Sequence, residues 1–240
     1  YDWVVSFDLN SLYPHLIMQY NISPETLRET RHGSASVERL LKQEVDIDGD
    51  YAVCANGAQF RKDVRGFLPE LMEKIYGERV IFKKKMLNAK QEYEHTPSKK
   101  LEKEIARCNN IQMAKKIQLN SAYGAIGNNY FRYYKLENAE AITLSGQVSI
   151  RWIENRMNEY LNKLLNSKDI DYVIASDTDS IYINFGPLVD KFFSHKIDDK
   201  TQVVNLLDKI CQDKLEPFID KSYEELANYV NAYDQKMFMK

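Results

Sequence analysis

The sequence predicts an α+β fold in which an antiparallel sheet with packed helices is interrupted by a long, projecting helical hairpin. Two observations lead to this prediction. Short apolar runs with strand character occur near the start of the chain and again after residue 170, and between them two long stretches place apolar residues at helical spacing. The 240 residues are 44% hydrophobic and 28% charged, a globular mixture that can fill a core.

Apolar runs bounded by turn residues predict the strands. Three runs have this character: 3–9, 172–175 and 181–183. The first is expected to be a buried strand that ends at Asp8, and the last two to be joined by a tight turn over 176–180. Residues 51–62 are expected to form a separate hairpin with Asn56-Gly57 at its turn.

Two long helices are expected to follow this hairpin. The second should begin with Thr96 as its N-cap and Pro97 at its first position, and it should run to about Tyr123, where Gly124 and Gly127 stop it. Each helix would have roughly 28 residues and a length of about 42 Å, and the pair is expected to pack antiparallel. Other helices are expected over residues 11–20, 37–43, 138–166 and 201–231.

Cysteine content and the pattern of apolar segments restrict the possible functions. Cys54, Cys108 and Cys211 are an odd number of well-separated cysteines, which argues against a disulfide framework or a zinc site and fits a reduced, intracellular setting. No membrane partner is expected, because the sequence has no transmembrane run and no secretory signal.

The charges are unevenly distributed along the chain. Residues 61–135 contain 17 basic and 8 acidic residues, a net charge of +9, so the remainder carries −11 of the overall −2. A basic central segment in an otherwise acidic chain is typical of a phosphate-binding module beside a metal-binding module. A solvated, charged helix pair would show the same charge pattern.

Three aspartates form the predicted chemical centre. Asp177 and Asp179 are two residues apart at a hairpin tip, where they repel each other unless a cation lies between them; a plain surface turn is the alternative interpretation. Asp8 ends another apolar strand. If the strands are neighbours, the three carboxylates meet at one edge of the sheet and could hold two Mg²⁺ ions for in-line phosphoryl transfer.

A cationic stripe on the helical hairpin is expected to face this centre. Arg79 and Lys83 are four residues apart on the first helix, and Lys116, Asn120 and Tyr123 follow one stripe of the second. In an antiparallel pair these residues lie near the base of the hairpin, where the basic side chains could hold nucleotide phosphates. Taken singly, each basic residue could equally be a solvent-facing helix charge.

Three motifs resemble those of family B DNA polymerases and occur in the family's order. Asp8–Pro14 (DLNSLYP) resembles the first palm motif DxxSLYPS, Lys116–Gly124 (KIQLNSAYG) resembles the fingers motif KxxxNSxYG, and Asp177–Ser180 (DTDS) resembles the third motif YGDTDS. The stretches NISPET, NNYFRYY and AITLSGQ resemble the T-even bacteriophage branch. The resemblance covers essentially the whole chain.

This resemblance implies a template-directed DNA polymerase core that adds dNTPs to a primer 3′-hydroxyl during DNA replication. Its partners would be primer-template DNA and dNTP, and its cofactors two Mg²⁺ ions, for which Mn²⁺ can substitute. Residues 1–65 and 126–240 would form the palm, and residues 66–125 the fingers. Asp8 and Asp179 would hold both metals and the carbonyl of Leu9 one of them, while Asp177 would tune the site.

The resemblance also implies roles around the nucleotide. The residues that would bind the triphosphate are Ser11, Leu12, Tyr13, Arg79, Lys83 and Lys116. Asn120 would help to seat the nucleotide, and Tyr13 would exclude a 2′-hydroxyl. Lys116 would also act in catalysis by protonating the leaving pyrophosphate. Tyr123 and Gly124 would pack on the nascent base pair.

The sequence departs from the family pattern in a few places. His15 stands where the family usually has Ser, and Ala175-Ser176 replaces Tyr-Gly before the third motif; no metal ligand is lost. Family members of this branch also carry an N-terminal domain, a 3′–5′ exonuclease and a thumb, none of which we recognise here.

The chain is therefore expected to be a palm-and-fingers core, located in the cytoplasm (the host cytoplasm if the protein is viral). One alternative is a non-catalytic fragment, or a subunit of a split polymerase whose other parts are separate chains. Another is a nucleotidyl cyclase, against which the long helical hairpin and the fingers motif argue.

Overall fold

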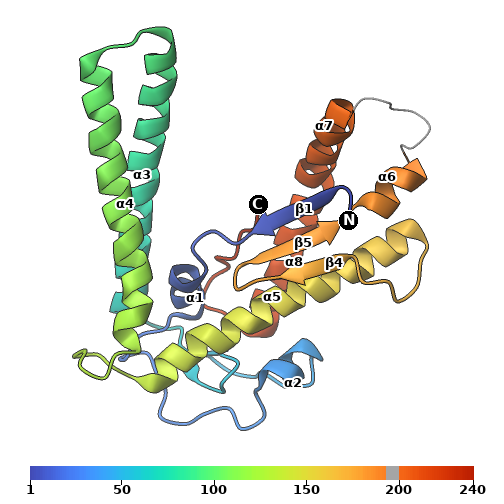
Figure 1. Cartoon of the computed structure of the whole chain (residues 1–240). Coiled ribbons are helices and arrows are strands. Elements are labelled where there is room, and N and C mark those ends of the chain that lie inside the picture. The colour runs from blue at the N-terminus through green and yellow to red at the C-terminus, as the bar shows by residue number, and fades with distance from the viewer. Residues whose placement is uncertain (193–199) are drawn as a thin grey trace.

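A three-stranded antiparallel sheet, flanked by helices and joined to a long helical hairpin, forms the architecture of the chain (Figure 1). The computed structural model describes residues 1–192 and 200–240. The strand order is β1-β5-β4, with β1 at Val4–Asp8, β5 at Ser180–Asn184 and β4 at Val173–Ser176. Both neighbouring pairs are antiparallel. The expected α+β class is confirmed.

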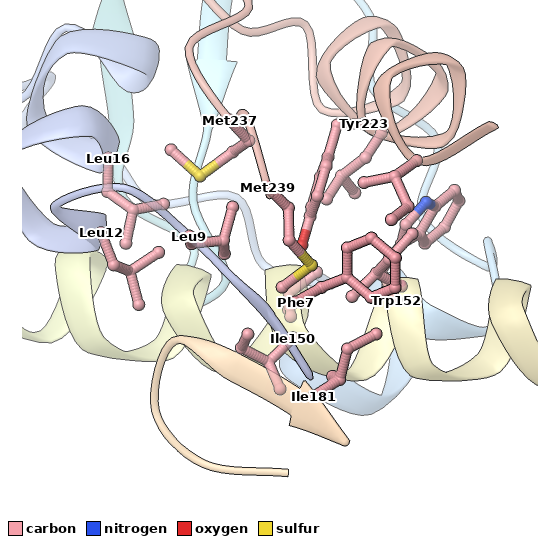
Figure 2. Close-up of a cluster of buried hydrophobic side chains, with 14 of the residues drawn as sticks. Phe7, Leu9, Leu12, Leu16, Ile150, Trp152, Ile181, Tyr223, Met237 and Met239 are labelled. Carbon is pink, nitrogen blue, oxygen red and sulfur yellow. The ribbon is translucent and has the colours of Figure 1, made fainter. Parts of the chain in front are cut away.

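One face of the sheet is buried and the other is open. Phe7 and Ile181 pack against Trp152 and Tyr223, which come from the helices α5 (Leu136–Leu165) and α8 (Glu216–Tyr229) (Figure 2). Ser6 pairs with Tyr182 on the opposite face, where Tyr182 is 39% exposed. The expectation of a buried strand over residues 3–9 therefore needs correction. Helices cover only one side of β1, so alternate side chains point away from the core.

The helical hairpin has the predicted form. Helix α3 (Phe67–His95) has 29 residues and α4 (Lys99–Ile126) has 28; the two run antiparallel and project from the rest of the molecule (Figure 1). The predicted caps need correction. Ser98 is the N-cap of α4, since its hydroxyl accepts a hydrogen bond from the backbone N–H of Leu101 at 3.3 Å, whereas Thr96 ends α3.

The end of α4 was also misplaced by a few residues. The helix continues through Gly124 to Ile126, and Gly127 is its C-cap. A side chain at position 124 would meet nothing within 4 Å. Gly124 is therefore an ordinary, exposed helical residue that does not terminate the helix, and its cost to helix stability is small compared with the packing of the surrounding turns.

The remaining predicted elements are present. Their bounds are α1 Leu12–Tyr20, α2 Val37–Leu41, β2 Tyr51–Val53, β3 Gln59–Arg61, α5 Leu136–Leu165, α7 Lys200–Ile210 and α8 Glu216–Tyr229. A π-helical segment, η1 (Cys211–Leu215), joins α7 to α8, and one short helix, α6 (Gly186–Phe192), was not expected. The turn between β2 and β3 contains Asn56-Gly57, and Gly57 has a φ of +81°.

Helix α1 lies between the hairpin, α5 and the last residues of the chain. Almost all of its side chains are buried, and Leu12 and Leu16 pack near Leu9 and Met237 (Figure 2). The segment ending at residue 240 runs beside the end of β1, where the N–H of Asp8 donates to the carbonyl of Lys240 at 2.8 Å. Among the described residues, no helix is both long and apolar enough to cross a membrane.

Asn21 connects α1 to the start of the hairpin. It caps α1 in the left-handed conformation (φ 58°), donates to the carbonyls of Arg61 and Val64 at 2.7 and 2.8 Å, and accepts from the N–H of Gly66 at 2.9 Å. One side chain thus fixes the backbone that leads into α3.

We predict that Asn21→Ala lowers the free energy of unfolding by about 3 kcal/mol, because it removes one buried and two partly buried hydrogen bonds to the backbone. Urea denaturation measures this loss. Asn166→Ala is the matched control: Asn166 caps α5 in the same conformation (φ 54°) but is exposed, so about 1 kcal/mol is expected. Equal losses in the two variants would contradict the structural role of Asn21.

Candidate active site at the base of the helical hairpin

A cleft of about 510 Å³ lies where the base of the hairpin meets the edge of the sheet. Its walls come from parts of the chain that are far apart in sequence. The lining residues are Asp8, Leu9, Asn10, Ser11, Leu12, Tyr13, Pro14, Arg79, Lys116, Asn120, Tyr123, Thr178 and Asp179. Most of the residues singled out from the sequence are among them.

The acidic side of the cleft is set by the pairing of β1 with β5. Asp8 lies opposite Ser180 in the ladder, and the N–H of Leu9 donates to the carbonyl of Asp179 at 2.7 Å, so Asp8 and Asp179 are held side by side. Burial and the neighbouring charge of Asp179 raise the pKa of Asp8, while the ammonium group of Lys116 opposes that rise. The two carboxylates therefore repel each other in the absence of a cation.

The cationic side comes from the hairpin. Lys116, Asn120 and Tyr123 follow each other at four- and three-residue spacing on α4, so they share one face of that helix. Arg79 on α3 reaches across to α1, where its Nη1 donates to the hydroxyl of Ser11 at 3.2 Å. Its Nε atom is buried and has no hydrogen-bond partner in the described part of the chain, so the guanidinium group keeps one unsatisfied donor.

Two tyrosines close one wall of the cleft. The rings of Tyr13 and Tyr123 lie 4.5 Å apart between centroids, at an angle of 32°. Burial, with smaller effects from Tyr123 and the charge of Asp179, raises the pKa of Tyr13. The Tyr13 phenol consequently stays protonated near neutral pH and can donate a hydrogen bond.

Three residues predicted for the site lie outside the cleft lining. Lys83 is exposed on α3, one turn beyond Arg79 towards the hairpin tip, and Gly124 is exposed on α4. The side chain of Asp177 accepts a hydrogen bond from the N–H of Thr178 at 2.7 Å and lines a separate pocket of about 330 Å³ with Gln147 and Arg151.

The expected meeting of three carboxylates is therefore corrected to two. Within residues 1–192 and 200–240, no group of three or more acidic, histidine or cysteine side chains is arranged to hold a metal ion. The physical reason is that residues 177–179 form the turn between β4 and β5, so the strand alternation that would place residues two apart on one face does not hold there.

Several cleft residues were not singled out from the sequence. Asn10 and Pro14 lie inside the first motif, and Thr178 lies between the two aspartates of the third, so their positions within the motifs were an available signal. His15, which is buried behind Ser11, was noted only as a departure from the family pattern.

Comparison with known proteins identifies the family. A sequence profile of DNA polymerase family B matches residues 1–223. The chain belongs to this family. It is 34% identical, over its whole length, to a DNA-directed DNA polymerase of Escherichia phage RB69, and 33% identical, over 99% of its length, to one of Enterobacteria phage T4.

More distant family B members also match. A DNA polymerase of Pyrococcus glycovorans is 32% identical over 76% of the chain, and the DNA polymerase delta catalytic subunit of Drosophila melanogaster is 29% identical over 77%. The chain spans only about 31% of the length of each of the two phage proteins.

The raised pKa of Asp8 predicts a pH dependence of folding. A carboxyl group whose pKa is raised on folding contributes stability that is present below the ordinary value of 3.8 and lost as the pH rises through the folded value. In metal-free buffer, Asp8→Asn should therefore be more stable than wild type at about pH 7, with the difference disappearing towards pH 3.8.

Thermal unfolding across this pH range measures the effect. Asp63→Asn is the control with the opposite sign, because the side-chain hydrogen bonds from Arg61 lower the pKa of Asp63. If Asp8→Asn is less stable than wild type at about pH 7, burial and the charge of Asp179 do not raise the pKa of Asp8 in the folded protein.

Proposed function

We propose that this chain carries the nucleotidyl-transfer centre of a template-directed DNA polymerase, which joins a dNTP to a primer 3′-hydroxyl. The observation that carries the proposal is the cleft itself, which joins Asp8 and Asp179 of the sheet to Arg79 and Lys116 of the hairpin. Paired carboxylates opposite paired cations suit a reaction in which metal ions and phosphates must be held together. Membership of family B supports this reading.

The donor set fits divalent metal ions. Asp8 and Asp179 supply hard carboxylate oxygens. Burial and the charge of Asp179 raise the pKa of Asp8, and a bound cation would relieve the repulsion between the two carboxylates. With Leu9 at the cleft wall, these residues would hold two Mg²⁺ ions, or Mn²⁺ in their place. When bound, the ions would lower the pKa of the primer hydroxyl and neutralise charge on the triphosphate.

The cationic wall would hold the triphosphate. Arg79 and Lys116 face the carboxylates across the cleft, and Asn120 lies one turn beyond Lys116. Lys116 would donate a proton to the leaving pyrophosphate. Lys83 would join them only after the hairpin leans towards the sheet, a closing movement that suits its position one turn up α3.

The first motif would contact the sugar and phosphates. Ser11, Leu12 and Tyr13 line the cleft beside Asp8, so their backbone and side chains would meet the nucleotide. The Tyr13 ring would exclude a 2′-hydroxyl by its bulk, and Tyr123 with Gly124 would pack on the nascent base pair. Asp177 would act from the neighbouring pocket by tuning the electrostatics of the site.

On this proposal, residues 1–65 and 126–240 form the palm and residues 66–125 the fingers. A second candidate is a catalytic core that needs further parts. The chain spans about 31% of the phage polymerases it resembles, and a thumb or exonuclease supplied by other domains or subunits would complete its grip on primer-template DNA.

We predict that Asp179→Asn lowers the rate of nucleotide incorporation at least about 10³-fold, because a lost metal ligand removes several kcal/mol of transition-state stabilisation. Primer extension by the polypeptide that carries this chain, with Mg²⁺ or Mn²⁺, measures the rate. Asp48→Asn, which changes an exposed loop carboxylate outside the cleft, should extend primers as wild type does.

A second readout does not depend on catalysis. Mg²⁺ should raise the melting temperature of the wild-type and Asp48→Asn proteins but not that of Asp179→Asn, since a ligand that binds only the folded state stabilises it. An Asp179→Asn protein that extends primers at the wild-type rate, or that is stabilised equally by Mg²⁺, would refute the metal assignment.

A further inference from the structure

His15 is a buried histidine directly behind the first motif. Its side chain lies inside α1 with 6% of its surface exposed, and its ring meets the ring of Tyr76 on α3 edge-on, with centroids 4.5 Å apart and planes at 84°. The Nδ1–H group of His15 donates a hydrogen bond to the carbonyl oxygen of Ser11 at 2.9 Å. His15 therefore contacts both the first motif and the base of the hairpin.

Ser11 needs such support because its backbone is in an unfavourable conformation. Its φ of 51° and ψ of 58° lie in the left-handed region, which residues other than glycine rarely adopt. Its hydroxyl does not cap α1, since it accepts a hydrogen bond from Arg79. Its carbonyl accepts from both the backbone N–H and the ring of His15.

Tyr76 is the middle one of three side chains on one side of α3 that contact other parts of the molecule. Glu73, Tyr76 and Arg79 are spaced three residues apart on α3, so they follow one side of the helix. Glu73 pairs with Lys236 at 3.2 Å, Tyr76 meets His15, and Arg79 donates to Ser11. Together these three contacts hold the base of the hairpin against α1 and the last residues of the chain.

Burial favours the neutral form of His15, and two nearby cations add to this effect. Burial is the main cause of its lowered pKa, and the cations Arg79 and Lys236 lower it further, although the hydrogen bond to Ser11 opposes them. Lys236 is itself paired with Glu73 and Asp234. A neutral ring that donates through Nδ1 is consistent with the observed contact.

We propose that His15 is a positioning residue for triphosphate binding: it holds Ser11 and the base of α3 in the arrangement that presents the Ser11 hydroxyl and Arg79 to the substrate phosphates. The inference rests on the proposed nucleotide site. It extends that proposal by assigning a supporting role to a residue that does not line the cleft. His15 reaches the substrate only through Ser11 and Tyr76.

The test separates the hydrogen bond from the packing. His15→Asn keeps a donor near the position of Nδ1, whereas His15→Leu has a similar size but no donor, and both lose the ring contact with Tyr76. Titration calorimetry on the full chain with Mg²⁺ should give a tripolyphosphate affinity about fivefold weaker for His15→Leu than for His15→Asn, the value of one ordinary hydrogen bond. The same ratio is expected with dATP, because the effect lies at the phosphates.

Melting temperatures and two further variants complete the design. His15→Asn and His15→Leu should melt at similar temperatures, so a difference in affinity is not a difference in folding. His32→Leu is the matched control, since His32 also contacts a backbone carbonyl, that of Asp46, but lies in a loop outside the cleft, and its affinity should equal that of wild type.

Arg79→Gln separates a failure of the proposed nucleotide site from a failure of the role proposed for His15. If Arg79→Gln binds tripolyphosphate as tightly as wild type, the proposed nucleotide site is wrong and the role of His15 falls with it. If Arg79→Gln loses affinity but His15→Leu and His15→Asn bind equally well, the site stands and the positioning role of His15 is overturned.

Discussion

The antiparallel pairing of β1 with β5 is the constraint on which the rest of the site depends. It places the seventh and eighth residues of the chain beside residues 180 and 181, so that Asp8 meets the turn that carries Asp179. A shift of β1 by one residue in this register would move Phe7 out of the core and turn Asp8 towards it. The hydrophobic packing of the sheet and the geometry of the two carboxylates are therefore set by the same interaction.

The cationic wall is attached in a different way. Helices α3 and α4 pack along each other and stand away from the sheet, to which they connect through α1 and α5 (Figure 1). Side-chain contacts at the base of α3, rather than a ladder of backbone hydrogen bonds, hold Arg79 in place. On the proposed function, this attachment would let the cationic wall move towards the two carboxylates when a nucleotide binds.

Much of the architecture could be predicted from the sequence. Helical periodicity gave the two hairpin helices to within a few residues, and the motifs located Asp8, Lys116 and Asp179 in one cleft. Local signals were less informative: Thr96-Pro97 and Ser98 are both plausible caps, and only the backbone conformation selects Ser98. The open face of β1 depends on which helices cover the sheet, and the sequence of one strand does not contain that information.

The sequence also did not reveal the direction of a turn side chain or the partner of a buried polar group. By residue type and spacing alone Asp177 and Asp179 look equivalent, and only the family resemblance implied different roles for them. In the structure they line different pockets. His15 looked like a simple departure from a motif, because its partners, Tyr76 on another helix and a carbonyl in an unusual conformation, are defined only by the tertiary structure. Both cases depend on backbone geometry that periodicity does not encode.

The central claim is that the cleft between the sheet and the hairpin binds metal ions through Asp8 and Asp179. Anomalous diffraction at the manganese edge, from crystals grown with Mn²⁺ and a dNTP, tests it most directly. The account predicts anomalous peaks between these two carboxylates, within coordinating distance of the phosphates that Arg79 and Lys116 contact. Manganese bound only elsewhere, or a dNTP bound outside the cleft, would contradict it.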